Sequence, residues 1–191
     1  MTTSFNSVWI EAVSETVVSY RRMIDAIVAQ LSDAELHSRP AADINSVAII
    51  LRHLGGNLRS RWTDFLTTDG EKPDRNRETE FQEWDGDRDS LMAHFDAGWE
   101  ALTAAIQLVN RSNIDQQVLI RGEPHSIPQA LTRSMTHLTY HVGQMAIIAR
   151  MVHDGDWRWL TIAPGDSAKH NDRTWGTNAS RSVFGGDSDA K

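Results

Sequence analysis

Hydrophobic residues recur at intervals of three and four along four long stretches of this chain, a pattern that predicts amphipathic helices. We place these helices at about 7–31, 46–68, 89–110 and 126–153. The second begins behind Asn45 and Ser46, either of which is a favourable N-cap, and it ends before Gly70 and Pro73. The fourth carries Pro128 in its first turn, where the missing N–H costs nothing.

Two connecting segments differ from ordinary short turns. Residues 71–86 are polar apart from Phe81 and Trp84, and we predict a long loop that allows the chain to cross from one side of the helices to the other. The apolar run 118–120 is followed by a glycine and a proline, which predicts a short extended segment and a turn before the last helix. Four amphipathic helices without an extended sheet pattern predict an all-α fold, namely a four-helix bundle.

Length and composition narrow the class of protein. A chain of 191 residues fits one domain, which we place at residues 1–165, and the polar, glycine-rich residues 166–191 are predicted to form a flexible tail. The net charge of -7 argues against a nucleic-acid partner, because phosphates require a basic patch. No apolar run approaches the roughly 20 residues that span a bilayer, and the N-terminus lacks the pattern of a signal peptide. With no cysteine for disulfides or thiolate ligands, we expect a cytoplasmic protein without a membrane partner.

The candidate chemistry lies in two files of polar residues on the second and fourth helices. Each residue of a helix advances by about 100° around its axis. Measured from Leu131 in the apolar stripe of the fourth helix, His137 and His141 therefore lie at about 240° and 280°. Measured from Val47 in the apolar stripe of the second helix, His53 and Asn57 lie at about the same two angles. If the two helices are neighbours, His53 can meet His137 and His141.

Two interpretations of these histidines remain open from the sequence. A pair at i and i+4 is weak evidence alone, since chance gives roughly 0.3 such pairs in a chain with 8 histidines. In the first interpretation, the pair chelates one ion, because Cβ atoms at this spacing lie about 5–6 Å apart, and a third histidine leaves one position open for water or substrate. In the second, the polar files lie at the margin of the bundle, where backbone groups or water satisfy them.

A family resemblance favours the first interpretation. The segments NSVAIILRHLGGNLRSRWTDFLTTDGEKPDRNRETEF and EPHSIPQALTRSMTHLTYHVGQMAIIAR resemble the DinB/YfiT-like superfamily of damage-inducible helical proteins, within a bacterial subgroup of unassigned function. The resemblance spans about residues 5–165, and RHLGGNLRSRW and HLTYHVGQ are its most specific parts. It implies a four-helix bundle with a divalent ion, zinc or nickel, bound by His53, His137 and His141. It also implies a homodimer, which the seven tryptophans favour as interface anchors.

Other residues of the two helices are candidates for supporting roles. Asn57 and Gln144 lie one turn from a histidine and are placed to accept an imidazole N–H or to orient a substrate. Tyr140 is a third candidate, although it points about 60° away from the neighbouring ligand. Arg59 and Arg61 are candidates for binding an anionic substrate, with surface ion pairs as the alternative.

The remaining histidines give weaker signals. We interpret them as packing, turn or solvent-exposed residues: His37, His94, His125, His153 and His170. Of these, His37, His153 and His170 lie in or near loops.

Three functions remain as hypotheses. Three neutral imidazoles leave the charge of an ion uncompensated, so that such a centre lowers the pKa of bound water and attracts anions, including a thiolate. Leu138 and Thr139 stand where a zincin carries its glutamate, which excludes that class, and no catalytic residue is assigned. Because some members of the superfamily transfer low-molecular-weight thiols, the first hypothesis is a metal-dependent thiol-S-transferase acting on a small molecule. The second is a metal-dependent hydrolase of a small molecule, and the third is a non-catalytic, stress-related metal-binding bundle.

Overall fold

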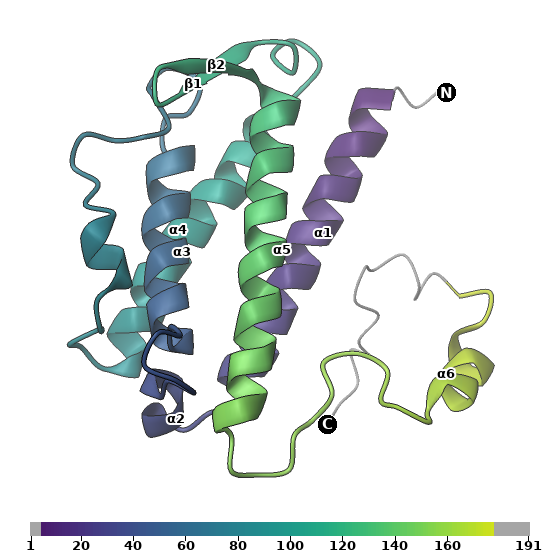
Figure 1. The fold of residues 1–191 in the computed structure, drawn as a ribbon. Coiled ribbons are helices and arrows are strands. Elements are labelled where there is room, and N and C mark those ends of the chain that lie inside the picture. Colours follow the sequence, from purple (N-terminus) through teal and green to yellow (C-terminus); the bar gives the residue numbers. More distant parts are fainter. Residues whose placement is uncertain (1–4, 178–191) are drawn as a thin grey trace.

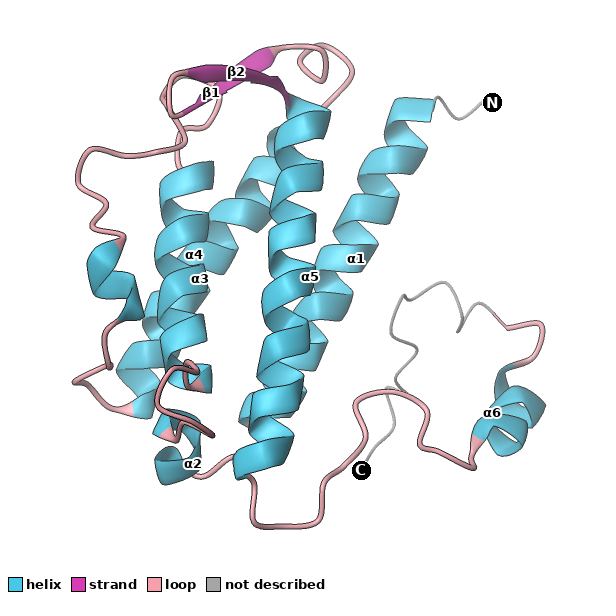
Figure 2. Ribbon diagram, in the orientation of Figure 1, coloured by secondary structure: helices cyan, strands magenta, loops and turns pink. Residues whose placement is uncertain are grey.

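Four long helices make up most of the structure, a computed structural model that describes residues 5–177 (Figure 1, Figure 2). They match the four helices predicted from the hydrophobic pattern: α1 (Phe5–Val28), α3 (Val47–Trp62), α4 (Arg88–Leu108) and α5 (Ile127–Val152). Three short helices accompany them: α2 (Asp33–His37), the 3-10 helix η1 (Glu78–Phe81) and α6 (Ser167–Thr174). The prediction of a helix-bundle fold with a long crossover segment is confirmed.

Side chains define where the helices of the site begin and end. Ser46 caps α3, since its Oγ accepts a hydrogen bond from the N–H of Ile49 at 3.2 Å, and Ser126 caps α5 together with Gln129. At its other end, α3 stops at Trp62 instead of continuing to residue 68 as predicted. The reason lies in Asp64, whose φ of 48° is in the left-handed region and is incompatible with a continued α-helix.

A small hairpin closes one end of the bundle. Strands β1 (Gln117–Ile120) and β2 (Glu123–Ser126) pair antiparallel, so the predicted extended segment is a two-stranded sheet. Arg121 and Gly122 both have positive φ, as a two-residue type I′ turn requires. The carboxylate of Asp69 accepts the backbone N–H groups of Arg121 (2.8 Å) and Gly122 (2.6 Å). The segment after α3 is thereby fastened to the hairpin, which lies across the top of the bundle in Figure 1.

The hydrophobic core is shared by the four long helices. Its largest fully buried side chains include Ile24 of α1, Leu54 of α3 and Phe95 of α4. Helices α3 and α4 approach closely where Gly98 faces Gly55, because a Cβ on Gly98 would collide with the backbone of Gly55. This contact fixes one face of α3 against α4 and leaves its opposite face to α5.

His153, which we predicted to be solvated, is instead held in a hydrogen-bond network. Its side chain is 15% exposed, and its Nδ1 lies 3.1 Å from Oε1 of Glu35. The same carboxylate accepts the N–H of Asp154 and belongs to the capping box of α2 with Ser32. Backbone hydrogen bonds from Ser32 and Asp154 lower the pKa of Glu35 to about 2. Glu35 thus joins the start of α2 to the end of α5.

The C-terminal part of the chain is described only up to residue 177. Helix α6 lies within the predicted tail and apart from the four long helices in Figure 1. The rest of the predicted tail falls outside the described residues, so its flexibility and the domain boundary at 165 stay predictions. Across residues 5–177, no helix combines the length and the apolar character needed to cross a bilayer.

Candidate metal centre

The three histidines singled out in the sequence meet between α3 and α5. Nε2 of His137 lies 3.1 Å from Nε2 of His53 and 3.1 Å from Nε2 of His141. One ring nitrogen from each residue lies within 4.8 Å of the other two. Two nitrogens bound to one tetrahedral ion at about 2.0–2.1 Å are roughly 3.3 Å apart, which is close to these separations.

Hydrogen bonds at the far ring nitrogens set the tautomers. Nδ1 of His53 donates to Oε2 of Glu80 at 2.8 Å, and Nδ1 of His141 donates to Oε1 of Gln144 at 2.9 Å. Both Nε2 atoms therefore carry lone pairs, and at most one proton, on Nε2 of His137, can lie among the three converging nitrogens. A cation at their centre satisfies all three lone pairs at once, so this set of donors fits a divalent ion.

Burial keeps the imidazoles of His137 and His141 neutral. It lowers the pKa of His137 to about 3, with repulsion from the imidazoles of His141 and His53 adding to the effect. Burial and the neighbouring His53 likewise lower the pKa of His141 to about 4. At neutral pH both side chains hold free lone pairs, which is the state that a metal ion requires.

A cavity of about 760 Å³ opens beside the three histidines, which line its wall. This volume is in the range of sites for small molecules. The ring of Phe81 stacks on His53 with a centroid separation of 4.6 Å and also lines the cavity. The site is therefore open to a ligand on one side and shielded by protein on the others.

A family model described as "Protein of unknown function (DUF1572)" matches residues 4–166. The chain belongs to the DUF1572 family. A search of curated proteins finds no match.

Two crystal structures share the fold of this DUF1572 protein. A DinB-like protein, YjoA, from Bacillus subtilis is 14% identical with a TM-score of 0.57, covering 78% of this chain and 96% of its own. A conserved protein from Enterococcus faecalis is 15% identical with a TM-score of 0.54, covering 79% of this chain and 98% of its own. The predicted resemblance to DinB-like proteins is confirmed for the fold, and the matching family model is one of unknown function, as expected.

The supporting residues expected in the DUF1572 chain lie around the same cavity. Gln144 makes the hydrogen bond to His141 described above, and Asn57 lines the cavity without a hydrogen bond to any described histidine. Tyr140 also lines the cavity; it is 61% exposed, and its ring lies edge-on to His141 at 5.0 Å. The two arginines separate, because Arg61 lines this cavity and Arg59 lines a different pocket.

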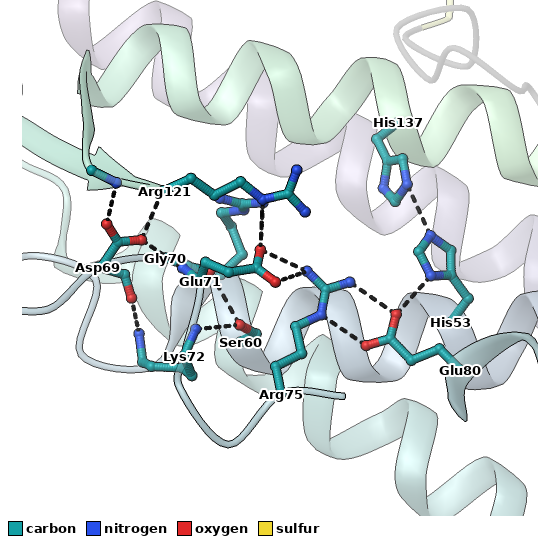
Figure 3. Close-up of polar contacts among 12 residues, drawn as sticks. His53, Ser60, Asp69, Gly70, Glu71, Lys72, Arg75, Glu80, Arg121 and His137 are labelled. Atoms are coloured by element: carbon teal, nitrogen blue, oxygen red, sulfur yellow. Dashed lines mark hydrogen bonds and ion pairs between the residues drawn. The ribbon is translucent and has the colours of Figure 1, made fainter. Parts of the chain in front are cut away.

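Glu80 is the site residue that we did not anticipate. It lies in η1, inside the segment predicted to be a long polar loop, and is only 5% exposed. Arg75 donates to both of its carboxylate oxygens at 2.8 Å. Figure 3 shows the resulting series of contacts from His137 through His53, Glu80 and Arg75. Burial alone would raise the pKa of Glu80, but Arg75 and His53 outweigh it and lower the pKa.

The sequence carries one indirect signal for Glu80. Gly56 stands in the interior of α3, where glycine costs roughly 0.5–1 kcal/mol relative to alanine. A Cβ on Gly56 would lie 2.5 Å from Oε1 of Glu80, so the glycine leaves the space that the carboxylate occupies. At this position of α3, the glycine therefore marks the close approach of Glu80.

Proposed function

We propose that this DUF1572 protein binds one divalent ion, zinc or nickel, through His53, His137 and His141. We further propose that it is a metal-dependent enzyme of the thiol-S-transferase type, acting on a small molecule. The observation that carries the proposal is the convergence of three imidazole nitrogens on the wall of an open cavity. A structural ion is usually closed off by four protein ligands, whereas three ligands and an adjoining cavity favour a reactive centre.

The residues of the chain have distinct roles in this proposal. A divalent ion held by three neutral imidazoles supplies Lewis acidity and positive charge that attract an anion such as a thiolate. Glu80 and Gln144 hold two imidazoles in the tautomer that directs Nε2 inward. Phe81 shields the ring of His53, and the cavity admits the second reactant.

Hydrolysis is less favoured because a general base is missing. No aspartate or glutamate is among the described residues that line the cavity. The carboxylate of Glu80 contacts His53 of the site, but it is already engaged by Arg75 and by His53 itself. Transfer of a thiol needs no base of this kind, because a thiolate is itself the nucleophile.

Metal content and thiol chemistry together test the proposal. We expect inductively coupled plasma mass spectrometry to find about one divalent ion per chain, lost in His53→Ala, His137→Ala and His141→Ala. His125→Ala is the matched control, because His125 is not among the cavity-lining residues.

The assay for turnover uses a low-molecular-weight thiol with 1-chloro-2,4-dinitrobenzene, in which the thiolate forms a C–S bond and chloride leaves. We expect a rate that a chelator abolishes and added metal restores. A wild-type protein that takes up no zinc or nickel would refute the metal site, and a loaded protein without metal-dependent turnover would refute the transferase.

A further inference from the structure

The cavity beside the histidines has a basic wall in an acidic protein. The chain has a net charge of -7, yet the described residues that line this cavity include no carboxylate. They include five arginines: Arg61, Arg75, Arg77, Arg121 and Arg133. Such a concentration of one charge in a cleft attracts ligands of the opposite charge.

Arg61 is a buried arginine whose hydrogen-bonding capacity is not fully used. Its side chain is only 10% exposed, and its Nη1 is shielded from solvent without a hydrogen-bond partner among the described residues. Its nearest carboxylate contact is Oε2 of Glu71, 3.9 Å from Nη2. Gly70 makes room for this guanidinium, since a Cβ there would lie 3.1 Å from Nη1. A buried N–H group without a hydrogen bond is costly, so a ligand that supplies an acceptor to this guanidinium is favoured.

The surrounding charges do not neutralise Arg61. Oε2 of Glu71 is shared, because it also contacts Nη1 of Arg75 at 3.1 Å and Nε of Arg121 at 3.2 Å. Arg133 is exposed and forms no ion pair within the described part of the chain. Burial lowers the pKa of Arg61, and the charges of Arg75, Arg133 and Arg121 add to this effect while Glu71 opposes it.

Three of the five arginines, namely Arg61, Arg121 and Arg133, lie on the hairpin side of the histidines. Helix α3 ends and α5 begins at the hairpin end of the bundle (Figure 1). Arg61 follows His53 by eight residues, about 12 Å along α3 toward the hairpin, and Arg133 precedes His137 by four residues, about 6 Å along α5 in the same direction. Arg121 lies at the turn of the hairpin itself.

We propose that the small molecule accepted by this cavity is an organic oxyanion. Its negative group is held by Arg61, with Arg133 and Arg121 beside it, while its other end reaches the three histidines one to two helical turns away. Guanidinium groups match carboxylate and phosphate oxygens in geometry as well as in charge. The histidine end of this arrangement rests on the proposed function, whereas the anion end depends only on the arginines.

Three thiols of one length test the anion end. We would titrate 6-mercaptohexanoate, 6-mercaptohexyl phosphate and the neutral 6-mercaptohexanol into zinc-loaded and metal-free protein by isothermal titration calorimetry. We expect at least one of the anionic probes to bind about tenfold more tightly than the alcohol in both forms of the protein, because a charge-assisted contact to a buried guanidinium adds to the chain contacts. The stronger of the two anionic probes identifies the oxyanion as carboxylate or phosphate.

Variants assign the preference to Arg61. In Arg61→Gln the preference for the anions should disappear, and in the exposed Arg133→Gln it should fall about threefold, which keeps the test valid if the first variant unfolds. Arg59→Gln, which changes an exposed arginine of α3 at another pocket, should keep the full preference.

The outcomes separate this proposal from the proposed function. Equal binding of anions and alcohol, or a preference that survives both Arg61→Gln and Arg133→Gln, would overturn the oxyanion site even if zinc binds and thiols react. A preference that depends on Arg61 in a protein that never binds zinc would establish the oxyanion site and refute the metal centre.

Discussion

Glu80 determines how His53 presents its second ring nitrogen. Its carboxylate is fixed from one side by Arg75 and from the other by Nδ1 of His53, and it occupies the space left by Gly56. A histidine ligand whose far nitrogen donates to a carboxylate is both oriented and more basic, so this glutamate would act on the proposed ion through its neighbour.

Replacing Glu80 should weaken metal binding without removing a ligand. In Glu80→Gln the paired charge with Arg75 is lost and the orientation of His53 relaxes, and we expect the affinity for zinc to fall about tenfold or more. Competition with a chromophoric chelator measures this change. Glu78→Gln is the control, because the side chain of Glu78 is 87% exposed. An unchanged affinity in Glu80→Gln would show that His53 is held by other contacts.

The residues of the site were predictable to different degrees. His53, His137 and His141 could be found because helical periodicity places each at a definite angle from its apolar stripe. Glu80 could not be found in this way, because the polar segment that contains it has no periodicity. Its position is fixed by tertiary contacts with Arg75 and His53.

At the scale of elements, the packing of α3 against α4 depends on two glycines. In Gly98→Ala the new methyl group would meet the backbone of Gly55, which cannot move aside as a side chain can. We expect a loss of about 1–3 kcal/mol in the free energy of unfolding, measured with urea. Gly143→Ala on α5 is the control with the opposite sign: nothing lies within 4 Å of its Cβ, and better helix propensity should add about 0.5–1 kcal/mol. Destabilisation of equal size in both variants would contradict this view.

The junction of α2 with α5 should give stability that depends on pH. The pKa of Glu35 is about 2 in the folded protein, below its ordinary value near 4.5, so its ionised form stabilises the fold above about pH 4.5. That contribution is lost as the pH falls from 4.5 toward 2.

We therefore expect Glu35→Gln to lower the free energy of unfolding at pH 7 and to approach the wild type near pH 2, as measured by chemical unfolding at several pH values. Glu123→Gln, at an exposed position of β2, should show no such convergence. A difference between Glu35→Gln and wild type that is constant with pH would exclude this role.

The elements themselves followed closely from the sequence, because long apolar stripes bury the same faces in any bundle. The structure differs from the prediction where the backbone conformation of one or two residues determines where a helix ends or how the chain turns. Helix α3 ends early at the positive φ of Asp64, and the extended run before α5 becomes a hairpin because Arg121 and Gly122 accept the I′ turn. Such conformations depend on partners distant in sequence, as Asp69 shows for the turn.

For the whole molecule, the proposed ion would join α3 to α5. A ligand that binds only the folded state, at a free concentration about 100 times its dissociation constant, adds about 2.7 kcal/mol to the free energy of unfolding. For a chain of this size, that corresponds to a rise of about 5–10 °C in Tm, which calorimetry with and without zinc would detect. His137→Ala should lose this response. A wild type whose Tm ignores zinc would contradict the proposed site.

The assembly of the molecule is a separate question. The homodimer stays a prediction, and light scattering would test it as a mass of twice one chain. The same measurement on metal-free protein would tell whether assembly depends on the ion.

The three histidines come from distant parts of the chain, since 84 residues separate His53 from His137. During synthesis at about 5–20 residues per second, His53 therefore leaves the ribosome roughly 4–17 s before its partners. Over that interval a nascent chain offers one imidazole of the three, too few to retain an ion against competing ligands in the cell. Loading of the proposed ion would then follow completion of α5, so that only chains that have been made and folded through this helix would acquire the proposed metal centre.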